Sequence, residues 1–223
     1  MSTFVLVPGA GGAAWYWHRV VGMLQGAGHR AVAVDLPGDD PSAGLPQYVD
    51  LVVDAADGRE EIVLVAQSMG AFTALGACTH IAVGHLVLVN AMIPEPGETA
   101  GQWWEATGWE AARTAAARAG GYPEAFDLET YFLHDVPAAL AAAGAAHQRP
   151  EADVAFEQPC DVVAWPEVPT TAFAAHGDRF FPLTFQQRVA AERLGLEPLV
   201  PPGGHLNALS QPDAVAGALL ALV

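Results

Sequence analysis

The sequence predicts an α/β fold in which a mostly parallel sheet is flanked by helices and carries a small α-helical cap. In the first half of the chain, short β-branched runs alternate with helical stretches, the pattern of parallel strands joined by crossover helices. From about residue 93 to residue 164 no convincing strand occurs, and strand patterns resume near residue 170. We therefore expect a single domain over residues 1–223, with residues 93–164 inserted as the cap.

The elements of the first half follow one another closely. Residues 4–8 form an apolar run that predicts a buried strand, and a glycine-rich turn follows it directly. Glycines end the next predicted helix, at residues 15–27. Further elements are then expected in this order: a strand at 30–35, a helix at 48–56, a strand at 61–65, a helix at 69–78 and a strand at 85–89.

The second half begins with the predicted cap, which contains an alanine-rich helix at 111–119 and two helical turns within 138–148. A strand is expected at 170–175. Pro182 occupies the first turn of the next helix, a position that proline favours, and this helix extends to residue 194. A short strand at 197–200 and a last helix at 211–223 complete the fold.

Charge and composition exclude several classes of function. Hydrophobic residues make up 52% of the 223 residues, which is enough for a sizeable core. The net charge of −16 argues against nucleic acids and anionic membranes as partners. The chain contains no lysine, so neither a Schiff-base mechanism nor a P-loop is available. No apolar stretch is long enough to span a bilayer. We expect a cytoplasmic protein, monomeric or homodimeric, that acts on a small molecule.

The two cysteines, Cys78 and Cys160, do not lie at the spacing of a metal site. We interpret them as buried free thiols. No metal and no organic cofactor is expected.

The residues around Ser68 have the pattern of a nucleophile elbow. An apolar strand at 63–65 leads into Ala66-Gln-Ser68-Met-Gly70, and a predicted helix follows at once. The positions two before and two after such a serine must be small, because strand and helix backbones approach each other there. Ala66 and Gly70 meet this need, although a glycine is more usual at the first position. The alternative role for Ser68 is an ordinary helix N-cap.

A serine nucleophile needs a base, and His205 is the best candidate. It follows Gly203 and Gly204 in a loop between the last predicted strand and the last helix. These glycines permit a tight loop that brings the imidazole over the serine. His176 is the main rival, and His134 in the cap is a further residue that we considered for a contact with substrate.

Asp178 is the candidate acid that orients this base. It follows a predicted strand and a glycine, which places it on a loop at the carboxyl edge of the sheet, where α/β folds build their sites. The order serine, acid, histidine is the one expected with this type of elbow. Asp153 and Asp161 are the nearest alternatives, but neither follows a strand. Asp178 also suits a simple turn or N-cap role.

The glycine-rich turn at residues 8–12 follows the first strand and offers backbone amides. It also has some likeness to a dinucleotide-binding loop, and Asp35 ends the second strand as a ribose-binding acid would. The spacing differs, however, because Ala14 stands where the third glycine of that loop is required. We favour a turn that supplies one amide of an oxyanion hole.

These motifs resemble those of the α/β-hydrolase superfamily, and in particular its compact branch of bacterial esterases, plant methylesterases and hydroxynitrile lyases. The resemblance covers both ends of the chain, and the cap only loosely. It implies a Ser68–His205–Asp178 triad and an oxyanion hole formed by the amides of Ala10 and Met69. Pro8 stands where many relatives have histidine, and the lysine used by the resembling lyases has no counterpart here.

We therefore predict a serine hydrolase that cleaves small or medium neutral, apolar or aromatic carboxylic esters through an acyl-enzyme. Candidate substrate-binding residues lie in the glycine turn, in the cap and beside the triad: Gly11, Trp103, Trp104, Tyr131, Phe132, Phe180 and Leu206, with Trp109 and Phe156 as further aromatic candidates. Two alternatives stay open. One is a lyase or cyclase that uses the same pocket for proton transfer, and the other is a ligand-binding protein with a relic triad.

Overall fold

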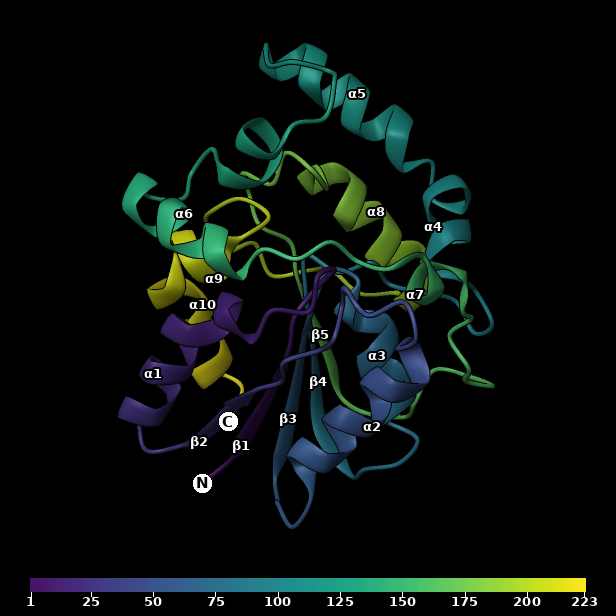
Figure 1. Ribbon diagram of the computed structural model, residues 1–223, viewed down its shortest axis with the longest axis vertical. Coiled ribbons are helices and arrows are strands. Elements are labelled where there is room, and N and C mark those ends of the chain that lie inside the picture. The colour runs from purple at the N-terminus through teal and green to yellow at the C-terminus, as the bar shows by residue number, and fades with distance from the viewer.

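The computed structural model describes residues 1–223 and contains a five-stranded, all-parallel sheet with helices on both faces (Figure 1). The strand order across the sheet is β2-β1-β3-β4-β5. This arrangement confirms the predicted α/β class. The strands are β1 (Thr3–Val7), β2 (Arg30–Ala33), β3 (Ile62–Gln67), β4 (Val83–Val89) and β5 (Thr170–Phe173).

The sheet is buried because its side chains alternate between two apolar cores. Along β1, Val5 and Val7 point into one core, whereas Phe4 and Leu6 point into the other. The first core lies under helices α2 (Leu45–Ala56), α3 (Gly70–Ala77) and α8 (Leu183–Leu194). The second lies under helices α1 (His18–Gly26), α9 (Asn207–Ser210) and α10 (Pro212–Leu220). Because all five strands are parallel, the residues that follow them meet at one edge of this buried sheet.

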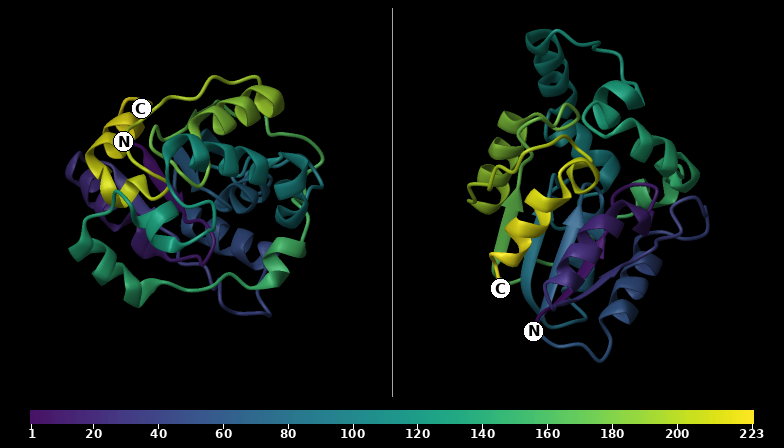
Figure 2. Two further views of the ribbon diagram at one scale, coloured as in Figure 1. Left: turned by 90° about the horizontal axis from the view of Figure 1, so that it is seen from above. Right: turned by 90° about the vertical axis from the view of Figure 1, so that its left-hand side faces the viewer.

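A long helical segment connects β4 to β5 and lies above the carboxyl ends of the strands (Figure 1). We call residues 90–169 the β4–β5 segment. Its two ends are joined by an isolated antiparallel bridge between Thr99 and Pro159. The two chain termini lie close together at the opposite end of the molecule (Figure 2). The helical elements of the segment are α4 (Ala100–Ala106), α5 (Trp109–Gly120), η2 (Glu129–Leu133), α6 (Ala138–Gly144), η3 (Ala145–His147) and α7 (Asp153–Glu157).

The expected strand at 197–200 is absent as a regular element. Only Leu199 pairs with β5, through an isolated parallel bridge to Phe173. Proline at 198, 201 and 202 removes the amide donors that a longer ladder would need. The predicted helix at 15–27 likewise divides into η1 (Ala14–Trp17) and α1. The last helix, predicted at 211–223, is α10, and the short helix α9 precedes it.

None of the helices combines the length and the hydropathy that crossing a membrane would require.

Candidate active site

Ser68 occupies a strained turn between β3 and α3. Its φ angle is +51°, a left-handed conformation that non-glycine residues rarely adopt. A Cβ atom at Gly9 would approach the Cβ of Ser68 to 2.9 Å, and a Cβ at Gly70 would overlap the carbonyl oxygen of Pro8. The small residues around the serine are therefore required by close backbone contacts, as the sequence pattern predicts. The turn leaves the side chain of Ser68 facing the loops beyond the sheet edge.

His205 lies between Ser68 and Asp178. Its Nε2 is 3.1 Å from Oγ of Ser68, and its Nδ1 is 2.8 Å from Oδ2 of Asp178. An ionised carboxylate can only accept a hydrogen bond, so Nδ1 carries the proton and Nε2 is free to accept one from the serine hydroxyl. The structure thus brings together three residues that lie 27 and 137 positions apart in the chain.

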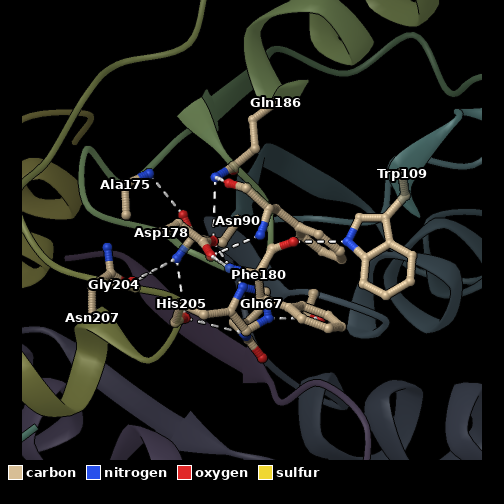
Figure 3. Close-up of polar contacts among 12 residues, drawn as sticks. Gln67, Asn90, Trp109, Ala175, Asp178, Phe180, Gln186, Gly204, His205 and Asn207 are labelled. Carbon is tan, nitrogen blue, oxygen red and sulfur yellow. Dashed lines mark hydrogen bonds and ion pairs between the residues drawn. The ribbon is translucent and has the colours of Figure 1, made fainter. Parts of the chain in front are cut away.

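The carboxylate of Asp178 is fully buried and well supplied with hydrogen-bond donors. Oδ1 accepts hydrogen bonds of 2.8 Å from the amides of Phe180 and Phe181. Oδ2 accepts one from Nε2 of Gln186 at 3.3 Å, in addition to its contact with His205 (Figure 3). These donors hold the carboxyl group in one orientation and compensate its removal from water.

Asn90 connects the His205 loop to the residues that follow β5. It was not among the residues selected from the sequence. It is completely buried and has a φ angle of +46°. Its Oδ1 accepts a hydrogen bond from the amide of Ala175 (2.8 Å), and its Nδ2 donates to the carbonyl of His205 (3.1 Å; Figure 3). Nε2 of Gln67 donates to the same carbonyl at 3.4 Å. The only signal in the sequence was the position of Asn90 directly after β4, at the carboxyl edge of the sheet.

Two backbone amides next to Ser68 have no hydrogen-bond acceptor within the chain. These are the amides of Ala10, in the turn after β1, and of Met69, at the start of α3. Both residues line one small cavity together with Gly9 and Gly70. Free amides at the positive end of a helix suit a developing negative charge, so the two residues remain the candidate oxyanion hole.

Aromatic rings enclose the imidazole of His205. The ring centroids of Phe132, Phe180 and Phe181 lie 4.9, 5.2 and 4.9 Å from that of His205, each at a steep interplanar angle. Trp109 fixes this wall by donating from Nε1 to the carbonyl of Phe180 at 2.7 Å. As a result His205 is only 1% exposed. Phe181 was not among the residues selected from the sequence.

The other aromatic candidates differ in their surroundings. Trp103 is fully buried, with Nε1 bonded to the carbonyl of Ile93, and Tyr131 is fully buried, with its hydroxyl bonded to the carbonyl of Pro123. Packing therefore leaves neither ring accessible to a substrate. Trp104 is partly buried and stacks obliquely on Trp109, so it belongs to the outer part of the aromatic wall.

The remaining candidates from the glycine turn and the histidine loop also have defined places. Gly11 is buried against the backbone of Arg149, whereas Leu206 is partly exposed directly after the histidine. His176, the rival base, is exposed on the surface and makes no side-chain hydrogen bond. Asp153 and Asp161, the alternative acids, are also exposed.

Asp35, which suggested a ribose-binding site, is engaged within the protein. Its carboxylate pairs with the guanidinium of Arg149 at 3.0 and 3.1 Å, and it accepts a hydrogen bond from the amide of Ala14. These contacts lower the pKa of Asp35 against the opposing effect of partial burial. The acid therefore fixes the end of β2 to the β4–β5 segment.

One family model matches nearly the whole length of the chain. The model of the alpha/beta hydrolase family matches residues 4–218. The chain belongs to the α/β-hydrolase family. The family match includes the serine turn, the Asp178 loop and the His205 loop.

Relatives of the chain carry two kinds of name. A probable esterase of Oryza sativa subsp. indica, PIR7A, is 36% identical in an alignment of 111 residues that covers 44% of this chain and 42% of the relative. Norfluorocurarine synthase 1 of a Strychnos species is 29% identical in an alignment of 104 residues that covers 41% of this chain and 39% of the relative. The matched part is thus well under half of either relative.

The fold itself is closely similar to that of solved α/β hydrolases. The crystal structure of polyneuridine aldehyde esterase superposes with a TM-score of 0.79 at 18% identity, and the match covers 100% of this chain and 99% of that one. At this level of identity the likeness establishes the fold.

Proposed function

We propose that this protein is a serine hydrolase that cleaves small or medium neutral carboxylic esters with apolar or aromatic groups. The observation that carries the proposal is the continuous relay from Asp178 through His205 to Ser68, with contacts of 2.8 and 3.1 Å. Family membership and the esterase names among the relatives support the same reaction class.

In the proposed mechanism, Oγ of Ser68 attacks the ester carbonyl while Nε2 of His205 takes the hydroxyl proton. Asp178 stabilises the resulting imidazolium through Nδ1. The amides of Ala10 and Met69 donate to the oxyanion of the tetrahedral intermediate. His205 then protonates the leaving alcohol. In the second half of the reaction, His205 takes a proton from water as the water attacks the acyl carbon. His205 then returns this proton to Oγ of Ser68, and the carboxylic acid is released.

The substrate class rests on the surroundings of the relay. The rings of Phe132 and Phe180 face the imidazole, so an apolar or aromatic group of the ester can pack against them. The net charge of −16 disfavours polyanionic substrates. We further propose that the β4–β5 segment acts as the cap of the site, because Phe132 and Trp109 both belong to it.

A lyase or cyclase reaction is the second candidate. The observation that favours it is the similarity to norfluorocurarine synthase 1, a relative that is not named as an esterase. In such a reaction His205 would move a proton without formation of an acyl-enzyme.

Labelling with a fluorophosphonate, followed by assays with a panel of short, aryl and methyl esters, tests the proposal. We expect stoichiometric labelling at Ser68 and measurable turnover of p-nitrophenyl acetate. Ser68→Ala should abolish both, whereas Ser42→Ala, at an exposed loop serine, should change neither. Full ester turnover by Ser68→Ala would place the nucleophile elsewhere. Labelling of the wild type without turnover of any ester would favour the lyase or cyclase.

A further inference from the structure

A short part of the β4–β5 segment holds the glycine turn that contains Ala10. Oε2 of Glu151 accepts a hydrogen bond of 2.6 Å from the amide of Gly11. Nε of Arg149 donates one of 3.0 Å to the carbonyl of Gly11. Both backbone polar groups of one turn residue are therefore bonded to side chains that lie 138 and 140 positions away.

These two side chains are themselves fixed to the core of the protein. The hydroxyl of Tyr48, on α2, donates to Oε1 of Glu151 at 2.7 Å. The guanidinium of Arg149 forms two contacts with the carboxylate of Asp35, which lies two residues after the end of β2. A planar guanidinium bonded in this way has little freedom to rotate. Gly11 is thus held by a network of four side chains, which we call the frame: Asp35, Tyr48, Arg149 and Glu151.

The conformation of the Gly9–Gly12 turn depends on these contacts to Gly11. Gly11 has a φ angle of +84°, and a Cβ atom there would collide with the backbone carbonyl of Arg149. The amide of Gly12 donates to the carbonyl of Gly9 at 3.0 Å, and this carbonyl shares a peptide plane with the amide of Ala10. Fixing the next peptide, between Ala10 and Gly11, therefore limits the directions in which the Ala10 amide can point.

Gly11 and Gly12 are buried, but Ala10 itself is exposed, so no packing contact fixes the direction of its amide. Glu151 also lines the small cavity that contains Ala10 and Met69. Burial raises the pKa of Glu151, so the carboxyl group is kept there in spite of a desolvation penalty. The hydrogen bonds from Tyr48 and Gly11 act against this shift and hold the carboxyl group in one orientation beside the turn.

We infer that Glu151 is a positioning residue for the oxyanion hole. Supported by Arg149 and Tyr48, it holds the Gly9–Gly12 turn so that the amide of Ala10 faces the oxyanion formed at Ser68. This inference rests on the proposed hydrolase function. It assigns to the β4–β5 segment a part in transition-state stabilisation, in addition to covering the site.

Glu151→Ala and Glu151→Gln test the inference, with Glu157→Ala, an exposed glutamate of the same segment, as the matched control. Loss of an oxyanion donor lowers kcat by roughly 10²–10³-fold, and we expect misdirection of a donor to cost roughly 10–100-fold. Glu151→Ala should therefore slow both ester hydrolysis and phosphonylation of Ser68 by that factor, with KM nearly unchanged. Glu151→Gln should recover most of the activity, because its side-chain oxygen can still accept from Gly11.

The outcomes separate the inference from the proposed function. If the wild type is not phosphonylated, the hydrolase mechanism itself fails. If the wild type reacts and Glu151→Ala reacts equally fast, only the positioning role fails. A loss confined to KM, or a folded glutamine variant as slow as the alanine variant, would also overturn it. Should Glu151→Ala not fold, Arg149→Met gives the second test, and an unchanged kcat in that variant would refute the role of the frame.

Discussion

Replacing Asp178 with asparagine changes one atom at the most constrained position of the relay. Oδ1 can keep its two hydrogen bonds to the amides of Phe180 and Phe181, which orients the new side chain. The NH2 group then occupies the place of Oδ2, opposite Nδ1 of His205 and Nε2 of Gln186. Three hydrogen-bond donors would then face one another with no acceptor between them. His205 must therefore move its proton to Nε2, and that nitrogen can no longer accept the proton of Ser68.

The expected effect follows from this change of tautomer. In a triad of this kind the wrong tautomer lowers kcat by about 10⁴-fold, which corresponds to about 5 kcal/mol in the activation free energy. Initial rates with p-nitrophenyl acetate would measure it, with circular dichroism as a check of folding. Asp161→Asn is the matched control at an exposed position and should leave the rate unchanged. A folded Asp178→Asn variant within tenfold of the wild-type rate would refute the role that we assign to Asp178.

Three further predictions concern the scaffold. Gly70→Ala places a Cβ against the carbonyl oxygen of Pro8, so we expect destabilisation by about 1–3 kcal/mol in urea unfolding; an unchanged midpoint would contradict the close packing of the turn. Trp103→Ala removes a fully buried ring and should lower the free energy of unfolding by about 3–5 kcal/mol, and a loss below about 1 kcal/mol would show that the ring is not part of the core. Burial raises the pKa of both thiols, Cys78 and Cys160, to about 12. They therefore stay protonated at pH 8, and Ellman's reagent should modify them only after guanidinium unfolding; rapid reaction of a folded thiol at pH 8 would contradict this pKa shift.

The fold was predictable from the sequence because its signals are local. Strands such as residues 62–67 are short apolar runs that end in glycine or polar turns, and the helices between them show their own start and stop signals. The strand prediction at 197–200 was wrong, because Pro198 within this apolar run and Pro201 and Pro202 after it have no amide to donate to a ladder.

The candidate triad was accessible for the same reason, since Ser68 and Asp178 lie on turns that follow strands and His205 follows a pair of glycines. Its supporting residues were not. Asn90, Gln186 and Glu151 carry no motif, and each acts through a contact with residues that are distant in the chain. Their importance depends on which backbone groups are left unpaired once the loops meet, and no pattern of hydrophobic and polar residues encodes that. Membership of the triad remains a prediction that the experiments above address.

The left-handed residues Ser68 and Asn90 have different consequences for the evolution of this protein. Both follow neighbouring strands of the sheet, and both hold left-handed backbone conformations that cost roughly 1–3 kcal/mol each in a non-glycine residue. A glycine at either place would relax the backbone, yet it would remove the hydroxyl or the carboxamide. At Ser68, selection for resistance to heat alone should favour glycine, whereas selection for turnover should keep serine. At Asn90 the carboxamide also serves stability, because its loss would leave the buried amide of Ala175 without an acceptor. Thermal resistance and activity therefore favour different residues at position 68 and the same residue at position 90.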